Sequence, residues 1–150
     1  MNKLGDIASS TAKGLLAGAV GTGAMTMSST IEMKMRGRQP STAPADAAAK
    51  VLRFNPQGEE EKKRFSNLVH WGYGTSWGGL RGLLAALGLG PVAGTAAHLG
   101  AVWGAELVML PALDIAPPAT EWGAKEVAID GWHHLVYVLA TGVAYSLLDQ

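Results

Sequence analysis

The sequence predicts an all-α, polytopic membrane protein in which four transmembrane helices form a bundle, with residues 1–150 as a single domain. Charged residues make up only 16% of the chain and hydrophobic residues 48%, whereas soluble domains carry about 25% charged residues. Residues 14–31, 82–105 and 131–148 contain no Asp, Glu, Lys or Arg. The chain also has 20 Gly, and small residues let membrane helices approach closely.

The first span is predicted over residues 12–30. A signal peptide is the alternative, but Asp6 separates the two N-terminal lysines and no Ala-x-Ala site follows the apolar stretch. Residues 32–66 form the one substantial polar segment. Within it, residues 46–54 predict a short helix lying along the membrane interface, and residues 59–64 place acids before bases, which favours the start of a helix.

The remaining spans are predicted over residues 68–88, 92–111 and 131–148. The Leu-Gly-Leu-Gly-Pro sequence that ends at Pro91 predicts a helix end and a tight turn. Pro111 closes the third span. Each of the four stretches is close to the length of about 20 residues that a bilayer requires.

The distribution of bases predicts the orientation. Nine of the 12 Lys and Arg residues lie in residues 32–66 and in the connection before the fourth span, whereas only Lys3 and Lys13 lie on the opposite side. Because bases collect on the cytoplasmic side, residues 32–66 are expected in the cytoplasm and both termini outside, in a plasma (bacterial inner) membrane.

Ionisable residues inside spans are costly and indicate a functional site. The predicted depths place His70, Glu106, Asp130 and His134 at one level, near the cytoplasmic ends of three helices. We expect their side chains to meet there. Arg81 is the deepest base, and Glu106 is expected to be its counter-ion.

Asp130 and His134 are four residues apart and so share one helix face. Further candidates lie on this face, beside it or at the end of the first span: His133, Glu126, Glu32 and Tyr137. His with carboxylates is ligand chemistry for Zn, Mn or Fe. The favoured interpretation is nevertheless a hydrogen-bonded network that holds the helices together without metal, because intramembrane polar groups also pair with one another. The alternatives are a metal site and haem ligation by His. The cofactor is left open.

Three segments carry a family resemblance: VHWGYGTSWGGLRGLL, AELVMLPALDIAPP and AIDGWHHLVYVLATG, within residues 68–145. They resemble the YagU-like family of small bacterial inner-membrane proteins. The matching positions are His70, the prolines from Pro111 onward, and Asp130 with His134. The family has His where this chain has Glu106. The resemblance implies a membrane location and no particular activity.

The chain lacks Cys, a P-loop, Gly-x-Ser-x-Gly and His-Glu-x-x-His, so it offers no recognisable catalytic chemistry. Its net charge of zero argues against nucleic acid as a partner. The leading hypothesis is a membrane scaffold or proton-responsive stress component. The alternatives are a metal- or haem-binding redox protein, and an oligomeric transporter or channel. The Gly spacings predict close helix packing inside the chain, at Gly14, Gly18, Gly74, Gly78 and Gly82. The expected partners are the bilayer and, if one of these Gly faces is used between molecules instead, a second copy.

Overall fold

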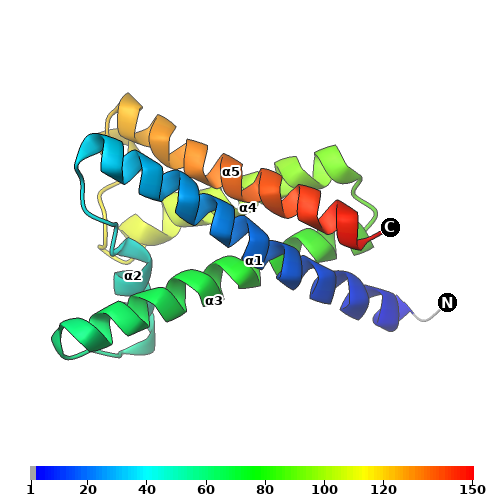
Figure 1. Ribbon diagram of the computed structural model, residues 1–150, viewed down its shortest axis with the longest axis horizontal. Coiled ribbons are helices and arrows are strands. Elements are labelled where there is room, and N and C mark those ends of the chain that lie inside the picture. The colour runs from blue at the N-terminus through cyan, green and yellow to red at the C-terminus, as the bar shows by residue number, and fades with distance from the viewer. Residues whose placement is uncertain (1–2) are drawn as a thin grey trace.

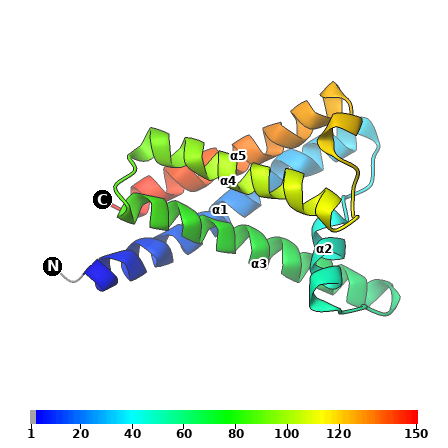
Figure 2. The ribbon, with the colours of Figure 1, turned by 180° about the vertical axis from the view of Figure 1, so that it is seen from behind.

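The computed structural model describes residues 3–150 and is helical apart from the connections (Figure 1). The elements are α1 (Lys3–Arg36), α2 (Ala43–Leu52), α3 (Gly58–Ala86), α4 (Pro91–Ala112), the 3-10 turn η1 (Ala119–Glu121) and α5 (Ala124–Leu148). The α1 helix lies between α3 and α5, and α4 lies on the opposite side of the molecule, as Figure 2 shows.

The all-α prediction is confirmed, and a helix covers each predicted span, but the prediction of a four-span transmembrane bundle is wrong. Among residues 3–150, α4 alone is long and apolar enough to cross a membrane. The error lies in treating uncharged residues as apolar. The uncharged part of α1 includes Thr22, Thr26 and Ser28, and that of α3 is rich in Gly, so neither is apolar enough to cross a bilayer.

The closest helix contact joins α1 to α3 through glycines. A Cβ atom added at Gly14 or Gly18 would lie within 3.0 Å of backbone atoms of α3. The same holds in reverse for Gly78 and Gly82, whose added Cβ atoms would meet the backbone of α1. The two helices therefore touch backbone to backbone, a distance that only Gly permits. The prediction that these glycines pack helices inside the chain is confirmed, and the same surfaces are not free to contact a second copy.

The α1 and α3 helices separate away from this contact, and α2 lies at the open end (Figure 1). The Phe54 and Phe65 rings, whose centroids are 5.0 Å apart, hold the end of α2 against α3. Lys50 on α2 pairs with Asp114 beyond α4, with 3.2 Å between Nζ and Oδ2. The short helix expected at residues 46–54 is therefore present, slightly earlier in the chain.

The predicted turn between the second and third helices is confirmed. Gly88 has φ 91°, a conformation that side chains with a Cβ rarely adopt. Pro91 then begins α4, where its fixed φ suits the first helical turn. The helix that covers the predicted fourth span is α5, which begins at Ala124, seven residues before that span.

We expect Gly78→Ala to destabilise the protein by about 1–3 kcal/mol, because the new methyl group would overlap the α1 backbone. Gly72→Ala is the matched control on the same helix. Nothing lies within 4 Å of its new Cβ, so the better helix propensity of Ala should leave stability equal or slightly higher. Thermal unfolding measures both. Equal behaviour of the two variants would show that the α1–α3 contact is not close.

Candidate functional site

The candidate site lies at the open end of the molecule, where α4 and α5 bring an imidazole between two carboxylates. His134 Nε2 is 2.6 Å from Glu106 Oε2 on α4. On α5, His134 Nδ1 is 3.0 Å from the Asp130 carbonyl oxygen and 3.7 Å from Asp130 Oδ2. The His134 side chain is buried and Glu106 and Asp130 are partly buried. These three residues converge as the sequence predicted, and we call them the Glu–Asp–His centre.

The contacts of His134 determine where protons must lie. A carbonyl oxygen can only accept a hydrogen bond, so His134 Nδ1 must donate to Asp130. His134 Nε2 then faces a carboxylate oxygen at hydrogen-bond distance. This second bond needs another proton, carried either by the imidazole or by Glu106. The His134–Glu106 pair therefore holds one more proton than a neutral imidazole beside an ionised carboxylate would.

Asp130 is oriented by a tryptophan. Trp103 Nε1 donates to Asp130 Oδ2 over 2.7 Å, and the Trp103 ring also packs against Gly131. One ligand atom from each of Glu106, Asp130 and His134 lies within 4.8 Å of the others. Carboxylate oxygens and imidazole nitrogen are ligands for Zn, Mn and Fe. The residues present thus fit a three-ligand metal site.

Other predicted members lie apart from this centre. His70 lines a cavity that the Glu–Asp–His centre also lines. Its Nε2, however, lies 2.8 Å from Thr26 Oγ1 and pairs with that hydroxyl. Tyr137 is buried and its hydroxyl donates to the Gly74 carbonyl over 2.6 Å. The expected pairing of Arg81 with Glu106 is wrong. Arg81 lies over the Tyr145 ring, nearer the other end of the helices, because its side chain leaves α3 about six turns beyond the start of that helix at Gly58, at 3.6 residues per turn.

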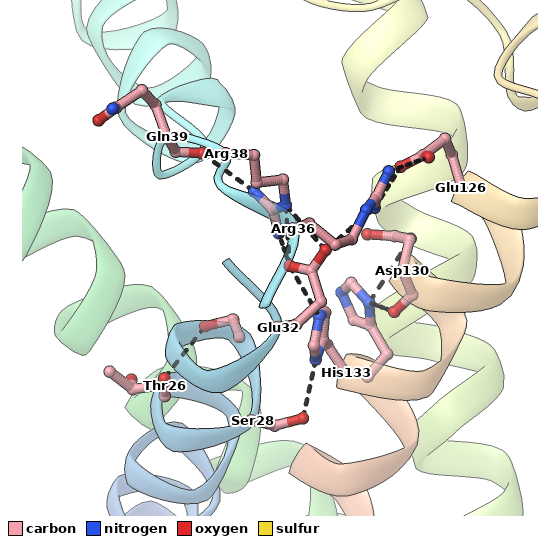
Figure 3. Close-up of polar contacts among 11 residues, drawn as sticks. Thr26, Ser28, Glu32, Arg36, Arg38, Gln39, Glu126, Asp130 and His133 are labelled. Atoms are coloured by element: carbon pink, nitrogen blue, oxygen red, sulfur yellow. Dashed lines mark hydrogen bonds and ion pairs between the residues drawn. The ribbon is translucent and has the colours of Figure 1, made fainter. Parts of the chain in front are cut away.

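An ion network covers the outer side of the centre (Figure 3). Glu32 at the end of α1 accepts two hydrogen bonds from Arg38 Nε, at 3.0 and 2.8 Å, and one from Arg36 at 3.0 Å. Arg36 also binds both carboxylate oxygens of Glu126 on α5. His133 joins α5 to α1, since its Nδ1 is 2.9 Å from Ser28 Oγ and its Nε2 is 3.8 Å from Glu32. The network thus joins the C-terminal end of α1 to the N-terminal part of α5.

The arginines set the ionisation of this network. Hydrogen bonds from Arg38, and then from Arg36, hold the pKa of Glu32 below its ordinary value of 4.5, against the opposing effect of burial. Arg36 likewise lowers the pKa of Glu126. Both carboxylates are therefore ionised near neutral pH, and the network is a set of charge-assisted hydrogen bonds.

Two cavities flank the Glu–Asp–His centre. One, of about 300 Å³, is apolar and is lined by α2 together with α3 and α4, including Val51, Leu52 and Met109. The other, of about 290 Å³, is more polar and is lined by α1 and α3 residues with Asp130. Glu106 and His134 line both. The centre is therefore reachable from the surface on two sides.

Two features were not predicted from the sequence. Trp103 was not recognised as a partner of Asp130, because nothing in the sequence shows which face of α4 meets α5. Arg36 and Arg38 enter the sequence analysis only through the charge of the cytoplasmic segment, and their hydrogen bonds to Glu32 are not predicted there. The spacing of Glu32 and Arg36, four residues apart in a helix, could have indicated their pairing.

Comparison with protein-family models, with curated proteins and with solved structures gives no match. The chemistry of the site is therefore argued from its geometry alone.

The stabilising effect of Glu32 should depend on pH. Since its pKa is lowered on folding, its contribution is present above the unfolded value of about 4.5 and is lost as pH falls through the lower folded value. Thermal unfolding should show Glu32→Gln less stable than the wild type near neutral pH. The difference should shrink below about pH 4.5. Glu60→Gln is the control, because the Glu60 side chain is 73% exposed in its pair with Arg64 and such pairs contribute little. A pH-independent difference for Glu32→Gln would contradict the assignment.

Proposed function

We propose that this protein works at a lipid membrane and is bound to it through α4. This helix has 22 residues and a mean hydropathy of 1.2 in its most apolar window, yet only 17% of that window is buried inside the molecule. A core helix of a soluble protein would be mostly buried. Val92 and Val108 are among the α4 residues that face outward, 85% and 69% exposed. The hydrocarbon interior of a bilayer would accommodate these exposed apolar side chains.

The distribution of charge supports the same proposal. Most charged residues lie at the end that contains α2, the start of α3 and the start of α5, and a few lie near the two termini at the other end (Figures 1 and 2). The outer surface between the ends carries exposed apolar residues of the other helices: Leu16, Val20, Met27, Leu139 and Val143. These side chains extend the apolar surface that α4 presents to the membrane.

The membrane proposal is tested by cell fractionation and by charged substitutions. The wild-type protein should stay with membranes after carbonate extraction and should need detergent to remain dispersed. Val108→Lys should reduce membrane retention, because a charge in the bilayer costs about 2.5–3.5 kcal/mol at the centre of a helix. Val51→Lys, at a 63% exposed position on α2, is the control and should be retained. A soluble wild-type protein would exclude the proposal.

At the membrane, we propose that the protein holds a cation at the Glu–Asp–His centre. The observation that carries this proposal is the 2.6 Å contact of His134 with Glu106, which requires a proton between two groups. His is the side chain whose charge changes most readily between pH 5 and 8. A centre of this kind can respond to protons without catalysing a reaction, in keeping with a scaffold or stress component.

A divalent metal ion is the second candidate for the same centre. It is favoured by the three ligand atoms within 4.8 Å of one another. The metal would take the place of the shared proton, so that His134 Nε2 and a Glu106 oxygen become ligands. Trp103 would then keep Asp130 oriented, as outer hydrogen bonds orient the ligands of metal sites. Zn, Mn and Fe suit this donor set.

Metal analysis of the detergent-purified protein separates the two candidates. If a metal is bound, His134→Ala and Glu106→Gln should each lower metal affinity more than about tenfold, and His134→Ala should also lower thermal stability. If the centre holds only a proton, both variants should be destabilised without any change in metal content. His133→Ala is the matched control, because His133 contacts Ser28 and Glu32. Wild-type stability of His134→Ala, with no metal in either protein, would contradict both candidates.

We further propose membership of the YagU-like family and a location in a bacterial inner membrane, on the motifs around His70, Pro111 and His134 described above. A transporter or channel built from several copies stays an alternative. It would use surfaces other than the glycines that join α1 to α3, because these are already in contact within the chain.

A further inference from the structure

Arg81 is buried in the interior without a counter-ion. Only 1% of its surface is exposed, although Arg is almost never fully buried unless it is paired. Its side chain runs from α3 towards α4 and α5. The guanidinium carbon lies 4.6 Å from the centre of the Tyr145 ring, and a Cβ added at Gly94 would lie 3.2 Å from it. The guanidinium is therefore enclosed by three helices.

Two of the three guanidinium nitrogens have no acceptor among the described residues. Arg81 Nε and Nη1 are buried and make no hydrogen bond, and the buried Tyr145 hydroxyl also has no partner. No ion pair found within residues 3–150 includes Arg81. The contact with the Tyr145 ring is favourable, but a buried charge without hydrogen bonds is strongly destabilising.

Residues 3–150 supply no negative charge to Arg81. Glu106 is bound to His134, and Asp149, near the end of α5, is bound to Lys13 at 2.8 Å. His98, which is also buried, lies with its Nε2 3.0 Å from the Trp77 carbonyl oxygen, and an imidazole offers no negative charge. A missing anion is the simplest compensation for one uncompensated positive charge.

We propose that Arg81 and the Tyr145 hydroxyl bind one small monovalent anion, chloride being the best fit, between α3, α4 and α5. A single positive charge is neutralised by a single negative charge. The crowding of the guanidinium by Gly94 favours a small spherical ion. Phosphate would bring further charge and several oxygens that need more donors than these two side chains supply. This site is independent of the Glu–Asp–His centre and of the membrane proposal.

The first test compares thermal unfolding of the full chain in chloride and in gluconate at equal ionic strength. The wild-type protein should unfold at a higher temperature in chloride, and the difference should grow with chloride concentration, because a ligand that binds the native state stabilises it. Arg81→Met should abolish this difference. Arg64→Met makes the same chemical change at an exposed position, where the side chain is 79% exposed, and should keep it.

The second test measures chloride binding directly by the NMR line width of the chloride ion. It uses Tyr145→Phe, which keeps the aromatic ring under Arg81 and removes the hydroxyl, and which should bind chloride about tenfold more weakly. This variant keeps the proposal testable if Arg81→Met does not fold. Equal unfolding temperatures of the wild type in chloride and gluconate would overturn the proposal, as would full chloride binding by Tyr145→Phe together with an undiminished chloride effect in Arg81→Met. A larger stabilisation by acetate or phosphate than by chloride would also overturn it.

Discussion

The backbone contact between α1 and α3 is the constraint on which the rest of the structure depends. Gly14, Gly18, Gly78 and Gly82 bring the two helices together over a short length. Two helices that touch so closely at one point and cross at an angle must separate elsewhere. The separation creates the open end, which α2 occupies together with the two cavities. The position of the Glu–Asp–His centre therefore follows from glycines that take no part in its chemistry.

The polar groups at the open end are arranged in two connected layers. The outer layer consists of carboxylates bound by arginines, which keep their charge near neutral pH. The inner layer places His134 between Glu106 and Asp130. His133 and His134 are neighbours in α5, and each belongs to one layer. A shift of α5 along its axis would therefore break contacts in both layers together, so the contacts of His134 are coupled to the ion pairs of the outer layer.

Two of the buried basic side chains, His134 and Arg81, have different surroundings. His134 has an oxygen partner for each ring nitrogen, so a proton on either nitrogen finds an acceptor within the chain. Arg81, on the far side of the α1–α3 contact, has only an aromatic face and crowded surroundings. An uncompensated charge of this kind is retained at a cost in stability, which is why an external anion is a reasonable partner for it.

The sequence by itself determined the helical class, the approximate positions of the helices, the turn before Pro91 and three residues of the centre. These depend on local signals, namely turn residues and the helical spacing of Asp130 and His134. The prediction that α1, α3 and α5 cross a membrane was wrong, because Gly, Ser and Thr are uncharged but do not make a helix apolar enough to cross. Only the tertiary structure decided that Glu106 meets His134 and not Arg81, and that Trp103 holds Asp130. Those pairings depend on how the helices rotate and slide against one another, and close glycine packing sets that arrangement between segments far apart in the chain.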